Sequence, residues 1–290
     1  MTAAMINREL NFFGNSPLLY LIATPIGNLG EMTPRALEVL KEIDYVACED
    51  TRNSGSLLKK FGLDKQFVSC HEHNEEEASQ KIISLLKEGK KIAYMSDAGY
   101  PTVSDPGERL TKRCIEAGIK VSVVNGPSAA ICGLVGSGLE ADHFYFYGFL
   151  PSKPSARKKE LESLKTREDT IVFYEAPHRI GATLKDMSSI LGGDRKAVIA
   201  RELTKQHEEY IRGTLGEMAE LDESTLIGEM VIIVEKQKSA AKTLSNDEIV
   251  EILKEKLETL SSKEAIKETA KENDIPKNVV YDIYLKNFKD

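Results

Sequence analysis

The sequence has few cysteines, no long apolar segment and no N-terminal targeting pattern. Its four cysteines lie far apart and none belongs to a C-x-x-C pair, so we expect reduced thiols in a cytoplasmic protein. No apolar run approaches the ~20 residues that a bilayer-spanning helix needs, so we expect no membrane contact. Residues 1–16 are polar and lack the apolar core and cleavage pattern of a signal peptide, which predicts a flexible tail.

Positive charge and metal ligands are also scarce. The formal net charge is −7 at pH 7. This balance counts against a protein that coats nucleic acid, because lysine and arginine dominate phosphate binding, although a local basic patch remains compatible with it. His71 and His73 could form a ligand pair, but no third ligand is evident nearby, so we expect no metal site.

Residues 17–125 repeat one pattern, in which a short apolar strand is followed by a turn and an amphipathic helix. Such alternation predicts an α/β fold with a parallel sheet that helices cover on both faces. The helical segments include residues 34–43 and 75–88. The expected strands are residues 18–24, 45–49, 66–70, 91–96 and 120–124.

The pattern breaks at Asn125-Gly126-Pro127-Ser128, and a second α/β unit follows. Residues 129–138 are rich in small side chains and suit a tightly packed helix. We therefore predict two α/β domains, residues 17–127 and 128–237. The strands expected in the second domain are residues 143–147, 170–174, 197–200 and 230–235.

The last segment, residues 238–290, predicts a small helical module. A polar stretch leads into Ser245-Asn246-Asp247-Glu248, which has the composition of a helix start. Three helices are expected, and the last two have helix-turn-helix spacing. Because acidic and basic residues are nearly balanced here, a packing or dimer role is favoured over nucleic-acid docking.

The segment Ser96–Gly107 is the most informative part of the chain. It follows an apolar strand and precedes a helix, so its two glycines, two prolines and two aspartates lie at the carboxyl end of a strand. Ligands bind at this edge in open α/β sheets, where glycine permits close backbone approach and proline fixes the loop. The alternative is an ordinary connection in which Ser104 or Asp105 caps the helix, with Pro106 in its first turn. That alternative leaves the first half of the segment unexplained.

Eight short motifs occur in order along the chain. They are Thr24–Leu29, Glu49–Arg52, Ser96–Gly107, Gly126–Ala129, Gly148–Pro151, Tyr174–Arg179, Arg201–Lys205 and Gly228–Glu229. Together they resemble the bacterial ribosomal RNA small-subunit methyltransferases I, a branch of the tetrapyrrole methylase superfamily, over residues 18 to about 237. The C-terminal module also resembles the helical appendage of this branch. One departure is Ala176, where a serine is common in the family, and we expect function to survive the loss of that hydroxyl.

The resemblance implies a fold and a reaction. Members of the family have two α/β domains with the cofactor folded into the cleft between them, and they form homodimers. They transfer a methyl group from S-adenosylmethionine to the ribose 2′-oxygen of a cytidine in the decoding centre of 16S rRNA. Because this chain is acidic, we expect its substrate to be the assembled small ribosomal subunit, where shape and protein contacts can supply affinity.

The cofactor residues are expected from the resemblance, position by position. The first strand ends at Pro25-Ile26-Gly27, which is not the G-x-G-x-x-G fingerprint but still has one glycine for close approach. Ser128 and Ala129 open a helix whose amides can bind a carboxylate, although Ser128 could also be a plain N-cap. Asp97, Ala98, Gly99 and Tyr100 should line the cofactor, with Asp97 as its polar anchor. The residues expected to close the pocket from the second domain are Tyr174, Arg201, Gly228 and Glu229.

Transfer to a ribose hydroxyl needs a positioned nucleophile and a group that takes one proton. Glu49, Asp50 and Arg52 follow the second strand, where acidic groups beside apolar residues would be costly to bury without a purpose. The alternative is that Asp50 caps a helix and Arg52 lies on the surface. Glu175 and Glu202 end strands of the second domain and are the other candidate bases. The sequence does not choose among these carboxylates.

Basic residues mark a candidate RNA surface. The run 153–159 has four basic residues and no acidic one, although a solvated helix start would look the same. Arg52, Arg179, Arg201 and Lys205 are candidate phosphate contacts near the motifs. The expected RNA-binding residues are Lys153, Arg157, Lys158, Lys159, Arg179 and Lys205.

Two other functions stay open. The same fold and cofactor would suit methylation of a tetrapyrrole carbon, as in corrin or sirohaem synthesis. The Glu49–Arg52 motif, the basic run and the C-terminal module stand against it. A non-catalytic ribosome-assembly factor that binds the cofactor as a structural ligand is the third possibility, and the intact set of carboxylates and arginines counts against it.

Overall fold

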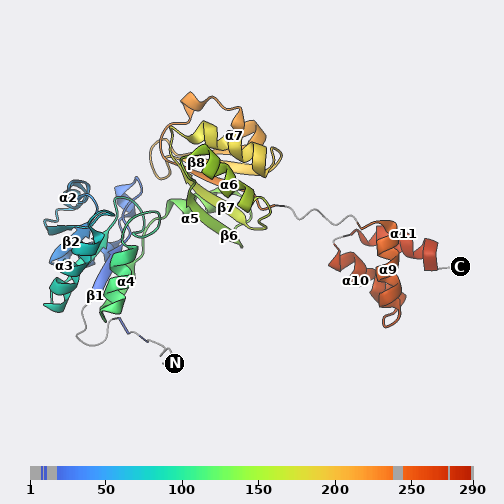
Figure 1. The fold of residues 1–290 in the computed structure, drawn as a ribbon, viewed down its shortest axis with the longest axis horizontal. Coiled ribbons are helices and arrows are strands. Elements are labelled where there is room, and N and C mark those ends of the chain that lie inside the picture. The colour runs from blue at the N-terminus through green and yellow to red at the C-terminus, as the bar shows by residue number, and fades with distance from the viewer. Residues whose placement is uncertain (1–7, 9, 12–17, 238–243, 274, 289–290) are drawn as a thin grey trace. The chain divides into compact units, whose positions relative to one another are not determined.

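The computed structural model describes residues 8, 10–11, 18–237, 244–273 and 275–288 of the 290-residue chain. The chain divides into two compact units, residues 1–235 and 236–290. The larger unit holds two five-stranded sheets, and the smaller one consists of helices (Figure 1). Most of the expected N-terminal tail lies outside the described residues. In the described part of the chain, no helix is both long and apolar enough to cross a bilayer.

The first sheet is wholly parallel, with the spatial order β3-β2-β4-β1-β5. Its central strands are apolar along their whole length because both faces are covered, and every residue of β4 is buried. The predicted parallel sheet is therefore confirmed. The strands are β1 (Leu18–Ile22), β2 (Tyr45–Cys48), β3 (Gln66–Ser69), β4 (Ile92–Met95) and β5 (Lys120–Val124).

Helices cover both faces of this sheet, each with its own apolar core. Ile82 of α3 and Leu110 of α4 pack into one core, and Leu40 of α1 and Leu58 of α2 into the other. Thr33 starts α1 by accepting a hydrogen bond from the Ala36 amide. The helices are α1 (Pro34–Glu42), α2 (Thr51–Lys60), α3 (Glu75–Lys87) and α4 (Glu108–Glu116), with a short 3₁₀ turn at Leu29–Glu31.

The second sheet is mixed, with the order β6-β7-β10-β8-β9. Only the β6–β7 pair is parallel, and the other three pairs are antiparallel. The edge strand β9 was not predicted, because its sequence carries charged and glycine residues and none of its side chains is fully buried. The strands are β6 (Phe144–Phe149), β7 (Thr170–Glu175), β8 (Lys196–Arg201), β9 (Glu209–Thr214) and β10 (Met230–Val234).

One helix covers one face of the second sheet, and three cover the other. Ala130 and Leu134 of α5 pack on the first face, while Leu161, Leu184 and Met218 join the larger core on the opposite face. The predicted domain boundary near residue 127 falls between β5 and α5, and it stays a prediction. The helices are α5 (Ala129–Ser137), α6 (Pro154–Leu164), α7 (Ile180–Leu191) and α8 (Leu215–Ala219), with a 3₁₀ turn at Glu223–Thr225.

The C-terminal unit consists of three helices around a small core of its own. Leu253, Ile266 and Val280 are buried in it, one from each helix. Ser245 and Glu248 form a capping box, which confirms the predicted helix start. The helix-turn-helix assignment stays a prediction. The helices are α9 (Asn246–Leu257), α10 (Ser262–Glu272) and α11 (Lys277–Phe288).

The start of α4 differs from the alternative interpretation of the Ser96–Gly107 segment. The helix begins at Glu108 with Gly107 as its N-cap, so the connection capped at Ser104 or Asp105 is not what the structure shows. Gly107 has φ +121°, a conformation that glycine adopts readily. A Cβ at this position would lie 2.5 Å from Cε1 of the fully buried Tyr94 ring. The end of the loop is therefore held against the core of the first sheet.

Gly107→Ala should destabilise the protein more than Gly118→Ala, its matched control. Gly118 also has a positive φ, +73°, but no atom lies within 4 Å of the site of its Cβ. We expect ~1–2 kcal/mol for the backbone conformation alone at Gly118 and a further ~1–3 kcal/mol from overpacking at Gly107. Denaturant unfolding followed by circular dichroism measures both values, and equal losses would contradict the packing explanation.

Candidate cofactor pocket and active site

Two loops at the carboxyl ends of β1 and β4 are pinned to each other. The Thr24 amide donates to the Gly99 carbonyl at 2.9 Å, and the Gly99 amide donates back to the Thr24 carbonyl at 3.0 Å. The buried Thr24 hydroxyl donates to the Ser96 carbonyl at 3.1 Å, and the Ser96 hydroxyl donates to the Gly99 carbonyl at 3.1 Å. The backbone of these loops is thus fixed by internal hydrogen bonds before any ligand binds.

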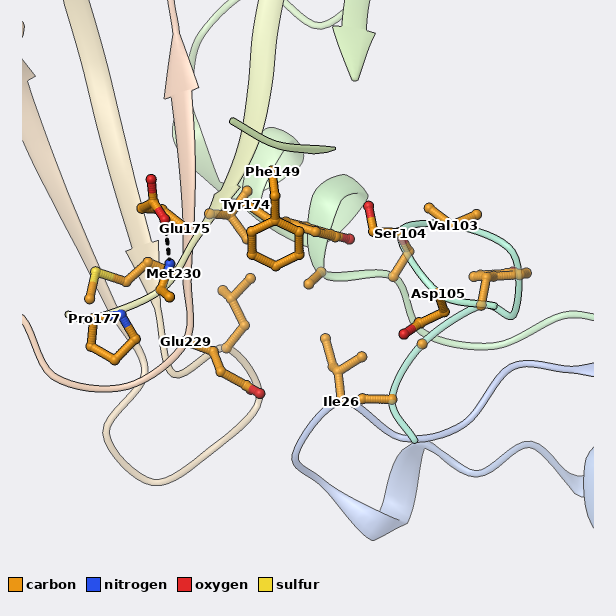
Figure 2. A pocket seen from close by; sticks show the side chains of 18 residues that line it. Ile26, Val103, Ser104, Asp105, Phe149, Tyr174, Glu175, Pro177, Glu229 and Met230 are labelled. Carbon is orange, nitrogen blue, oxygen red and sulfur yellow. Dashed lines mark hydrogen bonds between the residues drawn. The ribbon is translucent and has the colours of Figure 1, made fainter. Parts of the chain in front are cut away.

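A cavity of about 390 Å³ opens where these loops face loops of the second sheet (Figure 2). Phe149 and Tyr174 form an aromatic wall, with ring centroids 5.5 Å apart. Three carboxyl side chains, Asp105, Glu175 and Glu229, are among its lining residues, but no described lysine, arginine or histidine is. The other lining residues are Ile26, Ala98, Gly99, Tyr100, Val103, Ser104, Ser128, Ala129, Ala176, Pro177, Leu203, Met230 and Val231.

This cavity gathers most of the residues predicted to bind the cofactor. Those among its lining are Ile26, Ala98, Gly99, Tyr100, Ser128, Ala129, Tyr174 and Glu229. Pro25, Gly27 and Asp97 instead line a second cavity of about 120 Å³, where the Asn53 amide donates to Asp97 at 2.8 Å. Arg201 and Gly228 line neither cavity. Asp97 thus does not line the larger cavity, and its predicted role as the polar anchor stays a prediction.

Gly27, the single glycine after β1, was expected beside the cofactor but lies against another loop of the protein. A Cβ at Gly27 would lie 2.5 Å from Lys205 Cγ and 2.9 Å from Thr204 Oγ1. The close approach is thus between Gly27 and the loop after β8. It brings the two halves of the larger unit together beside the cavity.

Backbone strain is concentrated in the loops that border the cavity. Among the described residues, the only non-glycine residues with positive φ are Thr102, Ser104, Glu202 and Thr204, at +50° to +72°. Such conformations cost ~1–3 kcal/mol each and persist where the surroundings enforce them, typically at functional sites. Two lie in the loop after β4 and two in the loop after β8, which marks both loops as parts of one site.

The first turn of α5 also faces the cavity. Ser128 is the N-cap residue, but its side chain makes no capping hydrogen bond. Instead, the Ala130 amide donates to the Tyr174 hydroxyl at 3.2 Å. The hydroxyl of the aromatic wall is therefore fixed by the helix, and the plain N-cap interpretation of Ser128 does not describe it.

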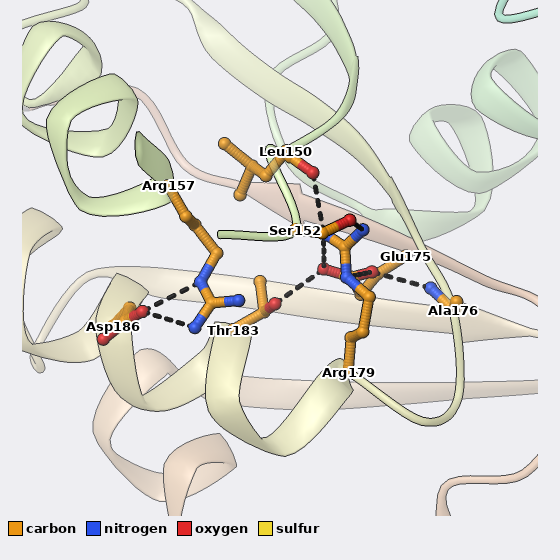
Figure 3. A network of polar contacts seen from close by, with 8 residues as sticks. All are labelled: Leu150, Ser152, Arg157, Glu175, Ala176, Arg179, Thr183 and Asp186. Carbon is orange, nitrogen blue, oxygen red and sulfur yellow. Dashed lines mark hydrogen bonds and ion pairs between the residues drawn. The ribbon is translucent and has the colours of Figure 1, made fainter. Parts of the chain in front are cut away.

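The Glu175 carboxylate is bound by several neighbouring groups of the second α/β half (Figure 3). Its buried carboxylate accepts hydrogen bonds from the Thr183 hydroxyl at 2.6 Å and from the Ala176 amide at 2.8 Å. It also pairs with Arg179, whose Nε lies 3.1 Å from Oε1. Arg179 in turn donates to the Leu150 carbonyl at 2.7 Å. These contacts leave Glu175 and Arg179 as structural groups, contrary to their predicted roles as base and RNA contact.

Arg157 is also structural. Only 5% of its side chain is exposed, and Nη2 lies 2.7 Å from Asp186 Oδ2 (Figure 3). A guanidinium buried in this way cannot reach a phosphate, so its assignment to the RNA surface is wrong. Lys153, Lys158 and Lys159 of the same run are exposed. The run is thus a half-buried helix start, with one arginine inside and three lysines outside.

For Asp50 and Arg52 the structure shows the alternative interpretation, in which Asp50 caps a helix and Arg52 lies on the surface. Asp50 caps α2 by accepting a hydrogen bond from the Arg52 amide at 2.8 Å, and it also pairs with the Arg52 guanidinium. These hydrogen bonds lower the pKa of Asp50 to about 2. A carboxylate with so low a pKa is a weak base. Glu49 is exposed, and the Arg52 side chain is 88% exposed.

Lys205 forms ion pairs with two other carboxylates of the site. Its Nζ lies 3.0 Å from both Glu202 Oε1 and Glu229 Oε2. Burial opposes ionisation of Glu202, but hydrogen bonds from Lys205 and the Glu229 amide outweigh it and lower its pKa. Arg201 is engaged in the same way, with Nε 2.5 Å from Glu209. Glu202 is therefore a poor base, and Lys205 and Arg201 are committed to carboxylates.

Asp105 is the carboxyl group that the site residues named from sequence missed. It lies in the Ser96–Gly107 segment, lines the cavity, and has no hydrogen-bond or ion-pair partner among the described residues. Burial raises the pKa of Asp105 to about 6, and the negative charges of Glu49 and Asp97 add to the rise. The available signal was its place at a strand end, but the sequence could not show that no described side chain pairs with it.

The chain belongs to the tetrapyrrole (corrin/porphyrin) methylases, whose family model matches residues 18–219. Within them it belongs to the ribosomal RNA small subunit methyltransferase I family. It is 45% identical to the Bacillus subtilis (strain 168) member, over 97% of this chain and 99% of that relative. It is 42% identical to the Synechocystis sp. member, over 92% and 97% of the two chains. The chain is therefore a methyltransferase, and the methyl donor of its family is S-adenosylmethionine.

Solved structures support the fold. The uroporphyrin-III-C-methyltransferase from Thermus thermophilus matches with a TM-score of 0.55 at 20% identity, covering 76% of this chain and 94% of that one. The methyltransferase CobJ matches with a TM-score of 0.59 at 15% identity, covering 77% and 95%. The predicted tetrapyrrole-methylase fold is thereby confirmed.

The raised pKa of Asp105 predicts how stability depends on pH. The folded chain holds this proton more tightly than the unfolded chain, so stability falls as the pH rises towards 6 and stays lower above it. The shift corresponds to at most ~3 kcal/mol, and screening by water around the half-exposed carboxyl reduces this to ~1 kcal/mol.

Asp105→Asn should therefore stabilise the fold by ~1 kcal/mol at about pH 8 and have little effect at about pH 4.5. The exposed Asp64→Asn serves as the matched control, and the effect of Asp105→Asn is measured relative to it. Denaturant unfolding at the two pH values measures the difference. The same effect at both values would contradict the raised pKa.

Proposed function

We propose that this chain transfers a methyl group from S-adenosylmethionine to a ribose 2′-hydroxyl of a cytidine in 16S rRNA, within the assembled small ribosomal subunit. The relatives named ribosomal RNA small subunit methyltransferase I support the RNA substrate. The observation that carries the cofactor assignment is the cavity itself, which is acidic and aromatic and has no described cation in its lining.

The residues present fit the cofactor. A sulfonium and an ammonium are both cationic, so a cavity that is lined by carboxyl groups and by no described cation suits them better than a basic cavity would. The aromatic wall of Phe149 and Tyr174 offers a face for the adenine ring. The first turn of α5 offers backbone amides to the carboxylate of the methionine part.

When bound, S-adenosylmethionine supplies a methyl group that is already activated by its sulfonium. The protein has to exclude water, hold the accepting hydroxyl in line and take up one proton. The pinned loops at Thr24 and Gly99 fix one wall, and the Glu175–Arg179 pair fixes the turn that carries Phe149 and Leu150. Positioning of this kind needs no metal ion.

A cytoplasmic homodimer is the state that we propose for the enzyme. The apolar side chains of Ile131 and Val135 lie one turn apart on α5 and are 45% and 72% exposed. Phe144 and Tyr145 are exposed on the edge strand β6. Exposed apolar groups of this size support a protein contact. The four cysteines are free thiols, as a reducing compartment would keep them.

The reaction is tested by transfer of a labelled methyl group. Small ribosomal subunits that lack the modification are incubated with the protein and labelled S-adenosylmethionine, and the digested rRNA is then mapped. We expect label on the ribose of one cytidine in 16S rRNA. Label on a base, or no label although the cofactor binds tightly, would contradict the proposal and favour a tetrapyrrole substrate or a non-catalytic role.

The three exposed lysines of the basic run should carry part of the RNA affinity. Changing Lys153, Lys158 and Lys159 to alanine should weaken binding to the small subunit and lower the slope of log affinity against log salt by roughly 2–3, while cofactor affinity is unchanged. A matched triple variant at Lys41, Lys87 and Lys90 removes the same charge near the amino ends of strands β2 and β4 of the first sheet. Equal salt slopes for the two triple variants would argue against an RNA surface at the start of α6.

A further inference from the structure

Six carboxyl groups lie in or beside the two cavities, and five of them are engaged or exposed. Glu175 is saturated by Thr183, the Ala176 amide and Arg179. Glu202 and Glu229 share Lys205. The other two of these five follow strands of the first sheet. Asp97 accepts a hydrogen bond from Asn53, and Glu49 is exposed and lines neither cavity.

Asp105 differs from all of them. It is half-buried, it lines the larger cavity, and no described residue donates a hydrogen bond to it or pairs with it. Figure 2 shows its carboxyl end turned toward the space between Ile26 and Phe149, with Glu229 facing it from the other wall. A carboxylate with free lone pairs in a ligand-sized cavity is suited to accept a proton from a bound ligand.

The loop holds Asp105 there at a cost. Ser104, its neighbour, has φ +63°, and Gly107 closes the loop against the buried Tyr94. The Ser104 hydroxyl lies against Gly148, with 3.0 Å left to the site of a Cβ there. Strain and packing therefore fix Asp105 between the two sheets. In an unstrained loop, its side chain would be free to turn to solvent.

We infer that Asp105 is a catalytic residue, the group that takes the proton of the accepting ribose 2′-hydroxyl during methyl transfer. This inference rests on the proposed function. As the hydroxyl oxygen forms its bond to the methyl carbon, the bond from that carbon to the donor sulfur breaks and its electron pair stays on sulfur. The hydroxyl proton passes to the Asp105 carboxylate, which releases it to water after the product leaves.

The surroundings of Asp105 suit this task. Glu49 and Asp97 approach it from the first sheet, Tyr94 lies beneath it, and Tyr174 and Glu229 face it from the second sheet. None of these groups is cationic, and together with burial the two nearby carboxylates raise the pKa of Asp105 to about 6. A base of this strength is ionised at neutral pH and still holds a proton better than an ordinary aspartate.

The test compares the wild-type enzyme with Asp105→Asn and the control Asp64→Asn in single-turnover methylation of small subunits. For Asp105→Asn we expect a rate about 10²–10⁴-fold lower at saturating cofactor. Calorimetry with S-adenosylhomocysteine should give an affinity within about threefold of the wild type, since Asn keeps the shape of the side chain. Asp105→Glu, which keeps the carboxylate, should recover part of the rate.

Two readouts separate catalysis from a structural or anchoring role. The wild-type rate should fall below about pH 6, because the base must be ionised, and this limb should be absent from the residual rate of Asp105→Asn. A carboxyl resonance that titrates near the same pH should disappear from the ¹³C spectrum of the unliganded variant.

Three results would overturn the inference: an unchanged rate in Asp105→Asn, a weaker cofactor affinity with an unchanged saturated rate, or an acid limb that persists in the variant. No methylation by the wild-type enzyme would instead refute the proposed function.

Discussion

The double hydrogen bond between Thr24 and Gly99 is the constraint on which the site depends. It joins the loops after β1 and β4, two neighbouring strands whose carboxyl ends meet at one edge of the first sheet. Because the bonds are internal and Thr24 is buried, the wall of the cavity is formed without a ligand. Ile26 and Asp105 both project from these loops into the larger cavity, so their separation is set by the backbone of the sheet.

Charge is distributed unevenly around the site. Cations near the site are committed to carboxylates: Arg179 to Glu175, and Lys205 to Glu202 and Glu229. This leaves a cavity without a cation in its described lining, within a chain that is acidic overall. A cationic methyl donor and a polyanionic RNA need opposite surroundings, and the chain separates them. The cofactor cavity is acidic, while the exposed lysines lie at the start of α6.

Much of the fold and part of the site could be predicted from sequence. The alternation of strands and helices gave the parallel first sheet, because buried strands are apolar throughout. β9 escaped prediction because an edge strand keeps polar residues. Among the residues predicted to bind the cofactor, Tyr100 and Tyr174 line one cavity. Arg157 and Glu175 were misjudged because a linear sequence does not show which charged side chain meets a partner in the core. Asp105 was missed for the converse reason, since its importance depends on the partners that it lacks.

A crystal structure of the enzyme with S-adenosylhomocysteine would test the central claim most directly. We expect the ligand to fill the cavity beside Phe149 and Tyr174, and the Asp105 carboxylate to face the open side of the thioether sulfur without bonding to the ligand. A ligand bound only in the smaller cavity, next to Asp97 and Asn53, would contradict the assignment of the larger cavity to the cofactor. An Asp105 carboxylate bonded to the amino group of the ligand would contradict the catalytic role, because that bond would make Asp105 an anchor for the ligand.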